Sequence, residues 1–110
     1  MTRDSIGEFE QLILLAIVRL DGEAYGVPIF REVEERTGRT ASEAAGYLAL
    51  RRLEAKGWVT SRLGDPTPTR GGRAKRYYRI AAKGRAQLTR ARANLVSMWE
   101  GFEPELDAHA

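Results

Sequence analysis

Residues 69–80 carry the strongest chemical signal in the sequence, TRGGRAKRYYRI. The stretch holds five lysines and arginines, two adjacent tyrosines and no acid. Cationic side chains bind phosphates, and neutralising the phosphates of a nucleic acid releases its condensed counterions. The stretch therefore predicts a surface for a polyanion. The competing interpretation is a solvated, arginine-rich surface.

The charge of the whole chain supports the first interpretation. The 110 residues have a net charge of +3, but residues 55–93 contain 11 basic residues and one acid. Residues 1–54 and 94–110 are both net acidic. A basic block between acidic ends is typical of a protein with one face for nucleic acid.

The sequence lacks the residues that several other classes of protein require. The chain has no cysteine and one histidine, His109, so it offers no thiol nucleophile, disulfide or His/Cys metal cluster. The pair Gly71-Gly72 is typical of a hairpin turn, and no phosphate-binding loop pattern is present. The apolar run at residues 12–18 is too short to cross a bilayer, and the first residues do not resemble a signal peptide. We expect a cytoplasmic protein without catalytic activity, cofactor, metal or membrane partner.

Three helices are predicted to position the basic stretch. Apolar residues at helical spacing predict a first helix over residues 9–20 and a second over about residues 25–38. A third helix follows the capping signal T-x-x-E at residues 40–43 and ends at residues 56–57. Thr40 and Ser42 compete as the N-cap of this third helix.

The hydrophobic period then changes to two. Residues 58–63 and 75–80 are rich in β-branched and aromatic residues and flank a Gly/Pro-rich segment, which predicts an antiparallel hairpin. A last helix begins near Ala82 and carries apolar residues at steps close to a heptad, with a bend or an end expected near Gly101.

This order of elements predicts a winged helix-turn-helix, mostly α with a small β-hairpin (α+β). Residues 5–81 would form the winged-helix domain, and residues 82–110 a C-terminal dimerisation helix. In such a fold the third helix enters the major groove and the hairpin, the wing, lies on the phosphates or in the minor groove.

The sequence resembles the PadR family of bacterial transcriptional regulators over about residues 8–102. The resemblance rests on Tyr25-Gly26, on Y-x-x-L-x-R-L-E-x-x-G from Tyr47 to Gly57, on G-R-x-K-x-Y-Y-x-I from Gly72 to Ile80, and on Gly84. Trp99-x-Gly101 looks like the short-tailed members. The resemblance implies a homodimer built through the N- and C-terminal helices, repression of nearby genes, and release by a small molecule, often a flat aromatic one.

Three residues depart from the family pattern or from helical preference. Ala81 stands where relatives usually have a threonine that caps the last helix. Glu43 stands where several relatives place a base or a polar group, at the start of the third helix. Gly46 lies inside the same helix, at a cost of about 1 kcal/mol relative to alanine. Direct reading of bases by this helix is therefore expected to be poor.

The candidate DNA contacts fall into two groups. On and before the third helix they are Arg39, Thr40, Ser42, Glu43, Tyr47 and Arg51; in the wing they are Arg70, Gly71, Gly72, Arg73, Lys75 and Arg76. Glu43 either accepts a hydrogen bond from a cytosine amino group or completes the capping box. If it completes the box, sequence preference would come from the wing and from DNA shape.

Apolar and aromatic residues outside these groups have two interpretations. The predicted dimer interface, which is also a possible ligand pocket, consists of Leu14, Val18, Leu88, Ala91, Leu95, Met98, Trp99 and Phe102. Trp99, with its neighbours Met98 and Phe102, belongs either to a dimer seam or to a pocket for a flat aromatic ligand. The aromatic residues Tyr47, Trp58, Tyr77 and Tyr78 are expected to pack in the core, although the Tyr47 phenol could also bind a phosphate.

Two functions follow from these observations. The first is a dimeric regulator that binds a pseudo-palindromic operator in double-stranded DNA, as a repressor released by a small aromatic ligand. The second is a winged-helix ligand-sensing or protein-interaction module with only weak, non-specific DNA binding. Glu43 and the alanines beside it motivate the second function.

Overall fold

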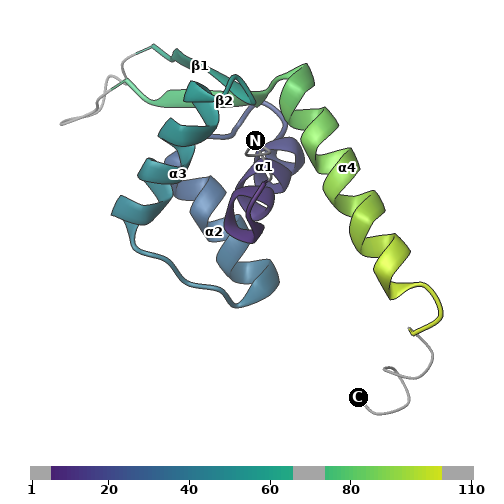
Figure 1. The fold of residues 1–110 in the computed structure, drawn as a ribbon. Helices are drawn as coiled ribbons and strands as arrows, with labels where there is room; N and C mark the ends of the chain where they lie inside the picture. Colours follow the sequence, from purple (N-terminus) through teal and green to yellow (C-terminus); the bar gives the residue numbers. More distant parts are fainter. Residues whose placement is uncertain (1–5, 66–73, 103–110) are drawn as a thin grey trace.

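The computed structural model describes residues 6–65 and 74–102 (Figure 1). Its elements are α1 (Glu8–Leu20), α2 (Gly26–Thr37), α3 (Glu43–Ala55), β1 (Val59–Leu63), β2 (Arg76–Ile80) and α4 (Ala82–Trp99). Three helices, a two-stranded antiparallel hairpin and a C-terminal helix make a winged helix-turn-helix, which confirms the predicted fold class. No helix in the described part of the chain is long and apolar enough to cross a membrane.

The first three helices and the start of the hairpin share one apolar core. Its fully buried side chains include Ile13 and Leu14 from α1, Ile29 from α2, Leu50 from α3 and Val59 from β1. Fully burying such a side chain contributes about 1.5–3 kcal/mol, so this core holds α3 in place against α1 and α2.

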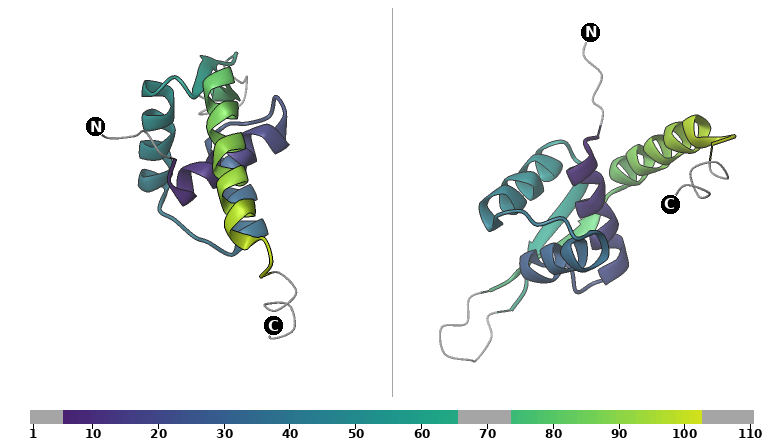
Figure 2. Two further views of the ribbon diagram at one scale, coloured as in Figure 1. Left: turned by 45° about the vertical axis from the view of Figure 1, so that its right-hand side comes forward. Right: turned by 90° about the horizontal axis from the view of Figure 1, so that it is seen from below.

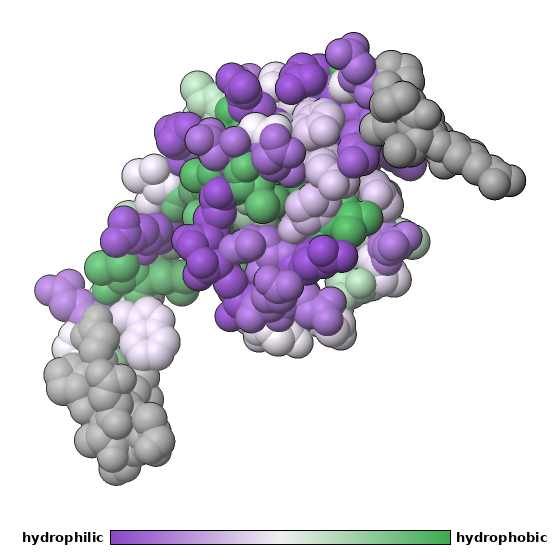
Figure 3. All heavy atoms as spheres, turned by 180° about the vertical axis from the view of Figure 1, so that it is seen from behind, coloured by the Kyte–Doolittle hydropathy of each residue, from purple (hydrophilic) through white to green (hydrophobic). Residues whose placement is uncertain are grey.

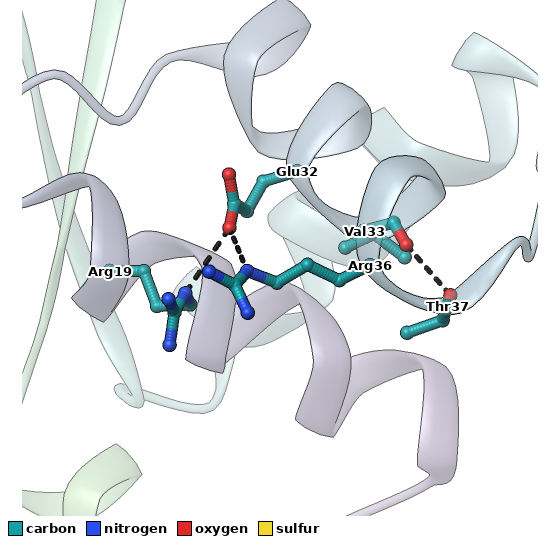
Figure 4. A network of polar contacts seen from close by, with 5 residues as sticks. All are labelled: Arg19, Glu32, Val33, Arg36 and Thr37. Carbon is teal, nitrogen blue, oxygen red and sulfur yellow. Dashed lines mark hydrogen bonds and ion pairs between the residues drawn. The ribbon is translucent and has the colours of Figure 1, made fainter.

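A polar network on the surface joins α1 to α2 (Figure 4). The Glu32 carboxylate accepts hydrogen bonds from Arg36, one turn later on α2, and from Arg19 Nε on α1 at 3.2 Å. The hydrogen bond from Arg36 is the main cause that lowers the pKa of Glu32 from its ordinary value of 4.5. Beside it on α2, Thr37 Oγ1 donates to the Val33 carbonyl at 2.7 Å.

The hairpin is tied to the helical body at its base. Val59 pairs with Ile80 and Leu63 with Arg76, in antiparallel register. The Tyr78 amide donates to the Ala24 carbonyl, in the connection between α1 and α2, at 2.8 Å. The two strands lie across one end of the helical body in Figure 1.

Helix α4 packs on the body through its first turns and then extends away from it (Figures 1 and 2). Gly84 permits the close approach, because a Cβ there would overlap the Trp58 carbonyl oxygen. Ala81 is the N-cap and supplies no side-chain hydrogen bond. The helix ends at Trp99, and Gly101 has a positive φ of 89°, so the structure shows an end of the helix and not a bend near Gly101.

Candidate nucleic-acid interface

Two glycines set the distance between α2 and α3. A Cβ on Gly46 of α3 would lie 2.5 Å from Cε1 and Cζ of Phe30 on α2, and a Cβ on Gly26 would overlap the Tyr47 ring. The Phe30 and Tyr47 rings meet edge to face, with centroids 5.1 Å apart. By helix propensity alone Gly46 is unfavourable, whereas the structure shows that its missing side chain makes room for Phe30.

The start of α3 is capped by Ser42, whose Oγ accepts from the Ala45 amide at 3.1 Å. Of the two predicted caps the structure has Ser42 and not Thr40, so the helix begins two residues after the position that a capping box from Thr40 to Glu43 requires. Glu43 is the first helical residue, and its carboxylate interacts favourably with the positive end of the helix dipole. Glu43 is thus not used to complete a box.

The exposed face of α3 carries the other predicted contacts. Glu43, Tyr47 and Arg51 follow one another at four-residue steps and therefore share one side of the helix. All three are exposed, with Tyr47 exposed by 42%. The Tyr47 ring packs on Phe30 and Gly26 along one side while the other side faces outward.

Arg39 does not join this face. Its Nη1 donates to Glu8 Oε1 at 3.0 Å, and its guanidinium carbon lies 5.0 Å from the centroid of the Phe9 ring. Both partners belong to α1, 30 or so residues earlier in the chain, so the sequence pattern around Arg39 gave no sign of the contact. The Glu8 carboxylate therefore competes with a phosphate for the charge of Arg39.

The wing residues predicted as contacts are only partly described. Arg70, Gly71, Gly72 and Arg73 lie outside the described residues. Lys75 and Arg76 are both exposed at the start of β2.

Arg76 connects the wing to the end of α3. Its Nη1 donates to Ser61 Oγ at 3.0 Å, and Ser61 Oγ donates to Glu54 Oε2 at 2.6 Å. Burial, and then the negative charge of Glu54, raise the pKa of the neighbouring Tyr78 phenol. The phenol therefore remains protonated near neutral pH and packs as a neutral group.

Two further cations on the hairpin were not predicted as contacts. Arg62 pairs with Tyr77 and Thr60 pairs with Arg79 across the strands, so Arg62 and Arg79 occupy the same face of the hairpin. Both are exposed. Alternation along the strands was visible in the sequence and was the signal that could have found them.

The predicted aromatic core is confirmed for Trp58, which is 3% exposed. Tyr77 and Tyr78 are half-buried at the base of the wing.

The predicted apolar surface lies mainly on α4. Of its residues, Met98 is 76% exposed, Phe102 56% and Leu95 54%. Leu14 is fully buried in the core, so its placement at a dimer surface was wrong; Leu15, beside it on α1, is 46% exposed. Val18 and Trp99 are exposed, and Leu88 and Ala91 are half-buried where α4 leaves the body.

A groove of about 470 Å³ runs between α1 and α4. Its lining residues are Gln11, Leu15, Leu88, Thr89, Arg92, Leu95, Val96 and Trp99. Hydrophobic side chains also gather on the far part of α4 in Figure 3. Apolar surface of this extent commonly marks an interaction site.

Comparison with known proteins decides the family. The sequence profile described as "Transcriptional regulator PadR-like family" matches residues 14–90. The chain belongs to this family. As a PadR-like protein it is a transcriptional regulator and not an enzyme, and its membership implies DNA binding.

Solved structures of similar proteins have the same fold. A PadR family transcription regulator from Clostridium difficile is 25% identical, with a TM-score of 0.68 over 94% of this chain and 98% of that one. A transcriptional regulator from Clostridium thermocellum is 24% identical, with a TM-score of 0.69 over 83% and 85% of the two chains. A PadR-like regulator from Bacillus cereus is 21% identical, with a TM-score of 0.61 over 91% and 88%. None of the curated proteins compared with the chain matches it.

Proposed function

We propose that this PadR-like regulator binds a pseudo-palindromic operator as a homodimer and represses transcription. The observation that carries the proposal is the exposed face of α3 beside a hairpin whose described cations Arg62, Lys75 and Arg79 have no carboxylate partner within the described residues. Exposed cations without a described carboxylate partner, beside a helix that can enter the major groove, are suited to contacts with DNA phosphates. The wing residues Arg70 and Arg73 would extend this surface.

The dimer is proposed from α1 and α4. The exposed apolar side chains Leu15, Leu95, Met98 and Trp99 lie on these two helices. Helix α4 extends away from its own body, which leaves most of its apolar surface for a second copy to cover (Figure 2). In a symmetric dimer the two α3 helices would meet successive major grooves, about one helical turn apart.

Readout is proposed to be shared between α3 and DNA shape. Glu43 is not needed for a capping box, so its carboxylate is available to accept from a cytosine amino group. The other predicted residues near the start of α3, Thr40 and Ser42, are exposed, although the Ser42 hydroxyl already caps the helix. Arginines of the wing would add preference for a narrow minor groove.

Release by a flat aromatic ligand is proposed from the groove between α1 and α4. The Trp99 and Val96 side chains line one part of it and Leu15 another. An aromatic ring stacked on Trp99 in this groove would change the packing of α4 and therefore the spacing of the two α3 helices. Quenching of tryptophan fluorescence by aromatic compounds, lost in Trp99→Leu, tests this part.

In vitro selection from random duplexes at about 150 mM salt tests the proposed function. Non-specific attraction is already weak at this salt concentration, so enrichment reports base or shape preference. We expect an inverted repeat to be enriched. No enrichment, with equally weak binding to all duplexes, would contradict the proposal.

That second outcome would favour a winged-helix module that acts through a protein partner. The observation in its favour is the contact between Arg39 and Glu8, which removes one predicted cation from the α3 surface. Glu43 at the start of α3 also repels phosphates.

A further inference from the structure

The side of α3 that faces away from the core is mostly apolar. The residues that the helix buries are Gly46, Ala49, Leu50 and Leu53. Successive residues of a helix are about 100° apart, so the positions farthest around the helix from the middle of this buried side are 44, 48, 51 and 55. These positions hold Ala44, Leu48, Arg51 and Ala55, which are all exposed. We call these four residues the outer strip of α3.

Leu48 is the largest apolar side chain of the outer strip. It is 45% exposed and takes no part in the apolar core of the described residues. A single exposed leucine is common on a protein surface. Leu48, however, lies at the middle of the helix face that would enter the major groove, one turn after the exposed Ala44. Its position therefore bears on what this helix contacts.

The proposed dimer does not account for Leu48. Helix α3 and helix α4 lie on opposite sides of the helical body (Figures 1 and 2). A second copy that covers α1 and α4 would thus leave the outer strip exposed. The outer strip is instead continuous with Tyr47, a predicted DNA contact on the same helix. DNA is therefore the partner that suits this face.

The composition of α3 limits how it could recognise bases. Its sequence contains neither asparagine nor glutamine, the side chains that usually form paired hydrogen bonds with adenine. Glu43 and Arg51 have groups suited to cytosine and guanine. The feature of an A·T pair that remains for this helix is the C5 methyl group of thymine, which apolar side chains contact in the major groove.

We propose that Leu48 recognises thymine methyl groups in the major groove, and that Ala44 allows α3 to approach the bases closely enough for this contact. The proposal rests on the proposed function, because it names the chemical group of the operator that α3 reads. Removing the methyl group and the leucine side chain from water together stabilises the complex. Guanine and cytosine present no methyl group there. Leu48 is thus a specificity-determining residue.

The experiment replaces thymine by deoxyuridine in the duplex obtained by in vitro selection, one position at a time and in both half-sites together. Deoxyuridine pairs with adenine as thymine does and lacks only the C5 methyl group. Loss of one buried methyl group corresponds to about a fourfold change in affinity, and loss of one from each half-site to about 15-fold. We expect one or two positions of the half-site to show this loss by fluorescence anisotropy at about 150 mM salt.

Leu48→Ala tests whether this side chain makes the contact. The variant should bind the thymine duplex more weakly than the parent does. At the sensitive positions, deoxyuridine should then change its affinity by no more than about twofold, the limit for groups that do not interact. A merely structural role of Leu48 would weaken binding to both duplexes equally and leave the 15-fold ratio unchanged. Circular dichroism melting confirms that the variant is folded at the assay temperature.

Leu63→Ala is the matched control. Leu63 ends β1 and is 59% exposed, so the substitution removes an exposed leucine of the hairpin instead of α3. Thymine methyl groups lie in the major groove, whereas the hairpin is expected on the phosphates or in the minor groove. L63A should therefore keep the 15-fold ratio between the thymine and deoxyuridine duplexes. Loss of the ratio in L63A would overturn the assignment to Leu48.

Ala44→Leu tests the close approach of the helix. Leucine is a good helix former, and position 44 is exposed, so the variant should fold. The larger side chain would hold α3 away from the bases, and most of the deoxyuridine effect should be lost. Parental affinity with the full 15-fold ratio in A44L would overturn the role of Ala44.

Failure of this inference differs from failure of the proposed function. Selection without any enriched duplex would overturn both. An enriched inverted repeat whose half-sites lack thymine, or whose affinity no deoxyuridine changes, would overturn thymine-methyl recognition and leave the proposed function intact. Positions that stay fully sensitive in L48A would likewise overturn the role of Leu48 alone.

Discussion

The hairpin end and the far end of α4 are both exposed, but their side chains differ in kind. The hairpin presents Arg62, Lys75 and Arg79, while α4 presents Leu95 and Met98 with more than half of their surface in water. Charged side chains are stable in water, whereas clustered apolar side chains are stabilised when another surface covers them. The difference indicates two separate tasks, one for a polyanion and one for a second apolar surface.

A charge placed in the apolar surface of α4 should give the largest effect on binding. Leu95→Asp would place a charge in the proposed dimer interface, and an uncompensated buried charge costs about 3–5 kcal/mol. We expect the dimer dissociation constant to rise by at least about 100-fold. Sedimentation equilibrium measures it, and operator affinity should fall in parallel.

Ala93→Asp is the control for this prediction. Ala93 is exposed on the opposite side of α4 from Leu95. Its substitution by aspartate adds the same charge. A dimer weakened equally by both variants would place the interface elsewhere.

The packing of α3 on α2 can be perturbed at Gly46. By helix propensity alone, Gly46→Ala would stabilise the protein by about 1 kcal/mol. Because the new methyl group would meet Phe30, we expect destabilisation by about 1–3 kcal/mol instead. Urea unfolding measures the sign, and a stabilised variant would contradict the role of the glycine in packing.

The first turn of α3 gives a smaller test. Ser42→Ala removes the side-chain acceptor of the Ala45 amide and should cost about 1 kcal/mol of unfolding free energy. Thr40→Ala is the matched control and should change stability by only a few tenths of a kcal/mol. If Thr40→Ala is the more harmful of the two, the helix begins earlier than the structure shows.

The smallest effect is expected from substitution of Glu32, which lies on α2 and belongs to neither the hairpin nor α4. Its pKa is lower in the folded protein than its ordinary value of 4.5, chiefly through the hydrogen bond from Arg36. This carboxylate therefore contributes stability above pH 4.5, and the contribution is lost as pH falls through the folded pKa. Glu32→Gln should flatten the dependence of the melting temperature on pH in this range, compared with Glu35→Gln. An unchanged profile would contradict the role of the network.

The helices and strands were predicted well because the signals that start and end them lie in neighbouring residues. Gly38 ends α2 in the left-handed conformation, with φ of 72°, as the sequence indicated. The capping of α3 was not decided locally, because Thr40 and Ser42 are both suitable caps two residues apart. The path of the chain into α3 decides it, and Arg39 helps to fix that path through Glu8.

The missed features depend on contacts between distant residues. Leu14 and Leu15 are adjacent leucines on a helix that is apolar on most sides, so only the packing of the other elements decides which one is buried. Gly46 looked unfavourable until its contact with Phe30 was known. Lys75 Nζ lies 3.4 Å from the Tyr25 hydroxyl, but the two residues are separated by 50 positions, so the sequence pattern gave no reason to join them.

The hairpin is proposed to bind DNA, while the apolar part of α4 is proposed to join two copies of the chain. Sedimentation equilibrium with a selected, labelled duplex of known mass measures the number of chains in the complex directly. We expect two chains per duplex for the parent, and loss of this complex in Leu95→Asp at the same protein concentration. A complex of one chain per duplex that Leu95→Asp leaves unchanged would contradict the claim.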